Sequence, residues 1–211
     1  MFSLDSSSLT AALAVLSLAF GAGCAEDLKL DSEDGPTETV ATEPLADGSF
    51  MTRVDASDAE AWIYFSFVSR GQVIPLDPLS SADWDLGFQR FHIVSNGGAS
   101  GSGGAAIAVL TEQSFDAVSS APADGYVPDQ PDSDDSDSVV NSMFEEGDGW
   151  YAYDDMTNRL SPRGNVYVVQ TARGAHYKLA ILDYYDVAGS SGHPSFSWAE
   201  LPESSTPGVD P

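Results

Sequence analysis

Residues 84–104 read WDLGFQRFHIVSNGGASGSGG, and the character of the sequence changes halfway along this stretch. The first part, WDLGFQRFHIV, is rich in aromatic and β-branched residues, which predicts one core strand with Trp84 and Phe88 in the interior. In such a strand His92 lies on the face of Trp84 and Phe88, so we expect a hydrogen-bonded structural histidine. The second part, Asn96–Gly104, predicts a turn, because glycines permit positive φ angles and close backbone approach.

Short runs of the same kind recur between glycine and proline turn signals. They are AWIYFSFV (61–68), NVYVVQTA (165–172), HYKLAILDYYD (176–186) and SFSWAEL (195–201). The first run sends Ile63, Phe65 and Phe67 to one face, as a half-buried strand does. The turn RGA between the second and third runs indicates a hairpin, in which His176 opens the second strand on its solvated side. With no long stretch of helical period, the sequence predicts one all-β domain of many short, mostly antiparallel strands.

The charge balance restricts the possible partners. The 211 residues include 33 acidic and 8 basic side chains, a formal net charge of -25. Such a chain repels phosphate backbones, which excludes nucleic acid as a partner. We also expect no enzyme, because His92, His176 and His193 are scattered and neither a nucleophile elbow nor a phosphate loop is present.

The N-terminus predicts export. Residues 9–24, LTAALAVLSLAFGAGC, form an apolar run followed by small residues and the single cysteine, Cys24. This pattern is typical of a bacterial lipoprotein signal spanning residues 1–24, with an acyl anchor on Cys24 as the protein's contact with the membrane. A plain secretory peptide or a buried helix with an incidental cysteine is the alternative.

Composition also sets the expected domain boundaries. Residues 25–48 are acidic and poor in large apolar groups, so we expect a flexible tether. The globular domain then covers residues 49–201, and residues 202–211 form a frayed tail. An acidic insertion at residues 127–149 interrupts the strands. Its Asp132, Asp134, Asp135 and Asp137 are candidate calcium ligands, because calcium takes hard oxygen ligands. A solvated acidic loop without a bound ion is the alternative.

Three ordered segments resemble the HmuY family of bacterial haem-binding lipoproteins, over residues 53–201. They are Trp62–Phe67, the stretch 84–104 and YKLAILDYYD at 177–186. The matching positions are Trp62, Tyr64, Phe65, Phe67, Trp84, Asp85, Arg90, Phe91, Asn96, Gly98, Ser100 and Gly101. The resemblance implies an all-β fold and an outer-membrane lipid anchor. It also implies binding of haem or a porphyrin and transfer to a TonB-dependent outer-membrane receptor.

The family's haem ligands do not carry over directly. Where the resemblance implies a histidine a few residues after a tryptophan, this chain has Asp155, followed by Met156. A thioether is a legitimate axial ligand of haem iron, so Met143 and Met156 are the candidate pair. The alternative is that both methionines only fill apolar gaps or lie exposed. Arg159 and Arg163 are candidates for pairing with the haem propionates. A cell-envelope interaction module that has lost haem ligation, stabilised by calcium, is the second functional hypothesis.

Overall fold

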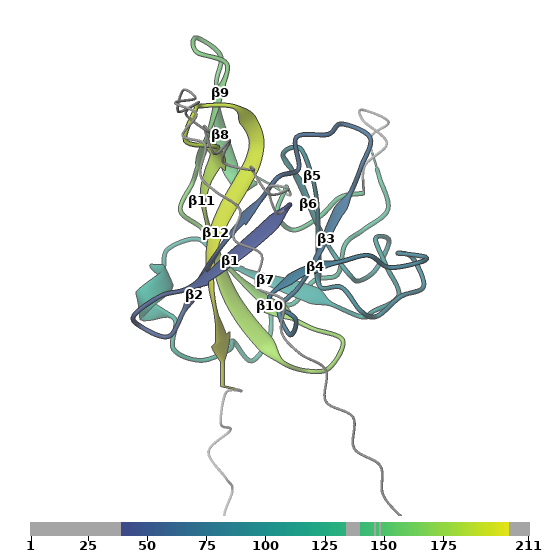
Figure 1. Cartoon of the computed structure of the whole chain (residues 1–211). Coiled ribbons are helices and arrows are strands. Elements are labelled where there is room, and N and C mark those ends of the chain that lie inside the picture. Colours follow the sequence, from purple (N-terminus) through teal and green to yellow (C-terminus); the bar gives the residue numbers. More distant parts are fainter. Residues whose placement is uncertain (1–38, 134–139, 146, 148, 203–211) are drawn as a thin grey trace, which may run out of the picture. The chain divides into compact units, whose positions relative to one another are not determined.

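The computed structural model describes residues 39–133, 140–145, 147 and 149–202. Within these residues it contains twelve strands and one short 3-10 helix, η1 (Phe115–Ala117), so the all-β prediction is confirmed. Six strands form an antiparallel sheet in the order β1-β2-β12-β11-β10-β7 (Figure 1). Their bounds are β1 Val40–Pro44, β2 Phe50–Val54, β12 Ser191–Leu201, β11 His176–Tyr185, β10 Val166–Gln170 and β7 Ala106–Leu110.

A second sheet has four strands in the order β4-β3-β5-β6. Its strands are β4 Gly71–Val73, β3 Ile63–Ser66, β5 Leu86–Gln89 and β6 His92–Ser95. The hairpin of β8 (Tyr151–Asp154) and β9 (Arg159–Pro162) stands apart as a two-stranded sheet, with β9 against β11. Figure 1 shows this hairpin at one end of the six-stranded sheet.

The main core lies between the two sheets and is built from aromatic side chains. Phe65 of β3 meets Phe196 edge to face at 5.5 Å between ring centroids, and Phe67 stacks on Tyr177 at 4.3 Å. Phe88 of β5 stacks on Phe196 at 5.5 Å. Such ring pairs add stabilisation beyond the apolar area that they bury. The alternation predicted for residues 61–68 and for the hairpin 165–186 is therefore confirmed.

The prediction of a single strand over residues 84–94 is wrong. The chain turns back after β5, with Arg90 in the left-handed region at φ 54°, and β6 pairs antiparallel with β5 from His92 opposite Gln89. Arg90 adopts this conformation because its backbone N–H donates to the carbonyl of Ala56 and its guanidinium to the carbonyl of Ser57. His92 therefore lies on a separate strand from Trp84 and Phe88.

The glycine-rich segment after β6 packs closely around buried polar groups, as the sequence predicts. A Cβ at Gly97 would lie 1.8 Å from the carbonyl oxygen of Ala105, and Gly98 has φ 58°. The Asn96 side chain donates to the carbonyls of Ser81 and Trp84 and accepts from the N–H of Gly103. These contacts make the segment a fixed scaffold.

Two further expectations need correction. Strand β1 lies inside residues 25–48, so the folded domain begins by residue 39, because β1 pairs with β2 along its whole length. His176 is buried, since it lies between Gln170 of β10 and Leu201 of β12, with its ring 5.4 Å from that of Tyr126. Strand β12, the last described strand, ends at Leu201.

Cys24 and the rest of the predicted signal, residues 25–38 of the predicted tether and residues 203–211 of the tail lie outside the described residues. In the part of the chain that is described, no helix is long and apolar enough to cross a membrane.

Candidate functional site

A pocket of about 400 Å³ lies where the β5–β6 turn, the β8–β9 hairpin and the ends of β11 and β12 meet. We call it the arginine pocket. Its principal lining residues are Arg90, Phe91, Tyr153, Arg159, Tyr184 and Tyr185. No acidic side chain is among its described lining residues, although the chain carries 33 acidic residues. Aromatic walls and two guanidinium groups suit a flat ligand that carries negative charge.

Arg159 is held in place by an aromatic side chain. Its Cζ lies 3.8 Å from the centroid of the Tyr185 ring, and the Tyr185 hydroxyl accepts a hydrogen bond of 2.9 Å from the N–H of Leu160. Tyr185 therefore fixes both the guanidinium and the strand that carries it. The other predicted cation, Arg163, does not line the pocket, and its Nε donates to the carbonyl of Tyr151 at 2.8 Å.

Met156 lies in the four-residue turn between β8 and β9. Asp154 shapes this turn by accepting from the N–H of Met156 at 2.9 Å and from the hydroxyl of Thr157 at 2.8 Å. The Thr157 and Met156 hydrogen bonds hold the pKa of the Asp154 carboxyl below its usual value. The Met156 side chain is 86% exposed, and Thr157 lines the arginine pocket. The turn thus presents an exposed thioether beside the pocket.

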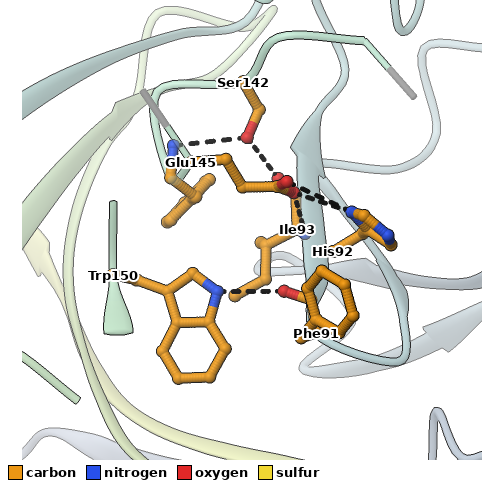
Figure 2. A network of polar contacts seen from close by, with 7 residues as sticks. Phe91, His92, Ile93, Ser142, Glu145 and Trp150 are labelled. Carbon is orange, nitrogen blue, oxygen red and sulfur yellow. Dashed lines mark hydrogen bonds and ion pairs between the residues drawn. The ribbon is translucent and has the colours of Figure 1, made fainter. Parts of the chain in front are cut away.

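A polar network ties the acidic insertion to β6, as Figure 2 shows. The Glu145 carboxylate contacts Nδ1 of His92 at 3.1 Å and accepts from the N–H of Ile93 at 3.3 Å. The Ser142 hydroxyl donates to the carbonyl of Ile93 at 2.6 Å. His92 is thus a buried residue with a hydrogen-bonded partner, as the sequence predicts.

Met143 is the next residue in the sequence after Ser142 of this network, and its environment differs from that of Met156. It is half-buried and packs against the main core, between two buried residues. Nearby, the indole N–H of Trp150 donates to the carbonyl of Phe91 at 2.9 Å (Figure 2). Phe91 also lines the arginine pocket. Neither methionine is itself a lining residue of that pocket.

The acidic insertion is also anchored through Asp129, which is buried. Its carboxylate accepts from the N–H and the hydroxyl of Ser95 and from the hydroxyl of Ser100, at 2.8, 2.9 and 2.6 Å. Burial raises the pKa of the Asp129 carboxyl from 3.8 to about 6, against the opposing effect of these hydrogen bonds. The expectation of a wholly solvated acidic loop is wrong at this residue, because the carboxylate fastens the insertion to β6.

The described residues give no support for calcium. Asp134, Asp135 and Asp137 lie outside them, and Asp132 is the only one of the four candidates that is described. Across the described ranges no group of three or more His, Cys, Asp or Glu side chains is arranged to hold a metal ion.

A second pocket, of about 420 Å³, lies on the face of the four-stranded sheet that points away from the core. We call it the tryptophan pocket. Its lining includes Glu60, Trp62, Tyr64, Leu79, Gln89 and Ser100. Gly87 lies beneath the two rings, because a Cβ there would be 3.3 Å from both Trp62 Cε3 and Tyr64 Cε1. No basic side chain is among its described lining residues, which distinguishes it from the arginine pocket.

The sequence patterns did not indicate Arg90 or Tyr185 as site residues. Arg90 enters the arginine pocket only because the chain turns back at that residue. The alternation of the run 176–186 puts Tyr185 on the predicted core face with Tyr177 and Leu179, and register shifts between Ile181 and Tyr185 interrupt this alternation in the structure.

Comparisons with known proteins identify the family. The model of the HmuY protein family matches residues 58–198. The structure resembles the Tannerella forsythia HmuY analog in its apo form, with TM-score 0.56 and 18% identity, covering 80% of this chain and 100% of that one. It also resembles a candidate HmuY-like haem-binding protein from Bacteroides vulgatus, with TM-score 0.54, 19% identity and coverages of 77% and 97%.

A third similar structure is a candidate lipoprotein from Bacteroides fragilis, with TM-score 0.53, 18% identity and coverages of 76% and 95%. Among curated proteins, none matches this chain. At these identities the structural likenesses establish the fold, and the family match extends over most of the domain described above. This chain therefore belongs to the HmuY family.

Proposed function

We propose that this protein is an exported lipoprotein that binds haem or a related porphyrin in the arginine pocket. The observation that carries the proposal is the placement of two guanidinium groups and several aromatic rings in one pocket of a strongly acidic protein. Haem is flat and carries two propionates, so it needs aromatic walls and cations together. The family membership and the haem-binding description of the Bacteroides vulgatus relative support the same ligand.

Met156 is the proposed thioether ligand of the haem iron. It is exposed on a turn whose shape is fixed by Asp154, and no packing contact in the core requires a methionine there. Met143 would be the second thioether ligand, and its half-buried side chain would have to turn outward. Thioether ligation favours ferrous iron, so binding should strengthen on reduction.

The remaining parts of the proposal concern place and partner. We propose that an acyl chain on Cys24 anchors the protein to the outer membrane of a Gram-negative cell. We further propose that the protein passes its ligand to a TonB-dependent outer-membrane receptor. Both steps rest on the signal-like sequence of residues 9–24 and on the family resemblance.

A haemin titration of the purified protein tests the proposed ligand. We expect a saturable shift of the Soret band at equimolar haemin, which sharpens after reduction with dithionite. Met156→Leu keeps the size of the side chain and removes the thioether, so it should weaken binding of reduced haem about tenfold. Met143→Leu is the matched variant, and an equal loss would assign both methionines to the iron. An unchanged spectrum in the double variant would refute methionine ligation.

Two observations favour the second candidate function, a cell-envelope interaction module that has lost haem ligation. Asp155 occupies the place where the family resemblance implies a histidine ligand, and the net charge of -25 opposes a dianionic ligand. A featureless haemin titration in both oxidation states would favour this function.

A further inference from the structure

The proposed haem binding does not explain the aromatic and polar side chains that line the tryptophan pocket. Glu60, Trp62, Tyr64 and Gln89 all line it, and among the described residues their side-chain polar atoms make no hydrogen bond. Pockets with aromatic walls and a few converging, unpaired polar groups are the usual form of a binding site. This pocket is therefore a second candidate site, on a different face of β5 from the main core.

Hydrogen bonds and a ring contact within the protein hold the walls of the tryptophan pocket in place without a ligand. The Trp84 indole donates to the carbonyl of Pro78 at 2.9 Å and its ring lies 4.8 Å from that of Tyr64. Asp77 accepts from the N–H of Leu79, whose carbonyl in turn accepts from the N–H of Ser102 in the glycine-rich segment. These contacts fix both walls, so a ligand would meet little ordering cost there.

The carboxylates and aromatic faces in and beside the tryptophan pocket favour a positively charged ligand. Glu60 is the charged lining residue, and Asp58 lies beside it, accepting from the N–H groups of Glu60 and Ala61 at 2.8 and 3.3 Å. Tryptophan and tyrosine faces attract cations, most often the guanidinium of arginine. The net charge of -25 adds a long-range field of the same sign.

Apolar side chains continue from the rim of the pocket along the connection between β4 and β5. Leu79 lines the pocket and is 65% exposed, while Ile74 and Leu76 are at least 90% exposed. Exposed aliphatic side chains grouped on one loop mark a contact surface for another protein. A free cation would use the pocket alone, whereas a polypeptide would also cover this loop.

We propose that the tryptophan pocket receives an arginine side chain of a protein partner, whose apolar residues beside that arginine pack on residues 74–79. This inference uses a different pocket from the haem proposal, so either one stands without the other. The partner is defined by its chemistry, an arginine flanked by aliphatic residues on an exposed segment.

The test uses three synthetic peptides and isothermal titration of the purified protein. The first peptide is acetyl-Gly-Leu-Arg-Leu-Gly-amide, the second has citrulline for arginine, and the third has glycine for both leucines. We expect the first to bind about fivefold more tightly than the citrulline peptide, because citrulline keeps the shape and loses the charge. The glycine peptide should bind more weakly than the first, since it cannot cover Leu76 and Leu79.

Matched variants locate the binding. Glu60→Gln and Trp62→Leu should remove the preference for arginine over citrulline. Glu112→Gln, which deletes the same charge on the exposed segment after β7, should retain it. A thermal midpoint close to that of the unchanged protein shows that each variant is folded.

Equal binding of the arginine and citrulline peptides would overturn the proposal, as would absence of binding. Equal binding of the first and glycine peptides would also overturn it, because the pocket would then recognise the cation without a protein surface. An arginine preference that survives in both Glu60→Gln and Trp62→Leu would place the contact elsewhere and refute the assignment.

Discussion

Two adjacent residues at the end of β5 belong to pockets of opposite character. Gln89 lines the tryptophan pocket, which contains a carboxylate and no described basic residue, whereas Arg90 lines the arginine pocket, which contains two arginines and no described acidic residue. Both pockets have aromatic walls and similar volumes, about 420 and 400 Å³. The comparison teaches that charge, and not volume, distinguishes the ligands that we propose for the two pockets.

The difference arises at one backbone position. Arg90 has φ 54°, which turns the chain into the β5–β6 hairpin, and its side chain lines the arginine pocket, whereas Gln89 points from the other face of β5 into the tryptophan pocket. On one side, Tyr185 holds Arg159 by a cation–π contact. On the other, Gly87 leaves room for the rings of Trp62 and Tyr64.

The largest expected effect comes from breaking the scaffold beside the tryptophan pocket. Gly97→Ala would place a Cβ 1.8 Å from the carbonyl oxygen of Ala105, so the backbone must shift. We expect a loss of about 3 kcal/mol in the free energy of unfolding, measured by urea denaturation. Gly104→Ala is the matched control, because it has φ 76° but open space around the new Cβ. Its loss should be about 1 kcal/mol, and a larger loss at Gly104 than at Gly97 would contradict the account.

A smaller effect concerns the pH dependence of stability. The pKa of Asp129 is raised from 3.8 to about 6 by burial, so the folded state binds the proton more tightly than the unfolded state. The stability that this provides is fully present below about pH 4 and is lost as the pH rises through about 6. Between pH 7 and pH 5 the unchanged protein should gain about 1 kcal/mol more than Asp129→Asn.

Urea denaturation of both proteins at the two pH values gives this difference. Glu145 also raises the pKa of Asp129, so Glu145→Gln should reduce the gain without removing it. An identical pH profile for the unchanged protein and Asp129→Asn would contradict this, because it would mean that folding does not raise the pKa of Asp129.

The smallest effect is on haemin affinity, and it separates the ring of Tyr185 from its hydroxyl. Tyr185→Phe keeps the ring under Arg159 and removes the acceptor of the Leu160 N–H, which should cost about 1 kcal/mol of stability. Haemin affinity should stay within about twofold, whereas Tyr185→Leu should lower it about threefold through loss of the cation–π contact. Equal haemin affinity in all three proteins would show that Tyr185 does not position Arg159.

The fold was largely predictable because its strands alternate. Phe65, Phe67 and Leu179 follow a period of two, and the glycines of residues 97–104 indicate a tight, specific turn. The β5–β6 turn was missed because Arg90 has no propensity for positive φ, and hydrogen bonds that Arg90 donates to the carbonyls of Ala56 and Ser57 impose it. Strand β1 was missed for a related reason, since its few apolar residues gain their stability from pairing with β2.

The candidate site was less predictable than the fold. Arg159 was found from its closeness in sequence to Met156, and the structure places it in the arginine pocket. Arg90 comes from the β5–β6 turn, and Tyr184 and Tyr185 come from β11, so sequence spacing contained no information about their meeting. The tryptophan pocket was hidden for the same reason, because Trp62 and Gln89 become neighbours only through sheet pairing.

The most direct test of the comparison is the haemin affinity of three proteins: the unchanged chain, Arg159→Gln and Glu60→Gln. Each variant alters one charged residue of one pocket. The account predicts that Arg159→Gln weakens haemin binding about tenfold and that Glu60→Gln leaves it unchanged. Equal losses in both variants, or a loss in Glu60→Gln alone, would contradict the assignment of haem to the arginine pocket.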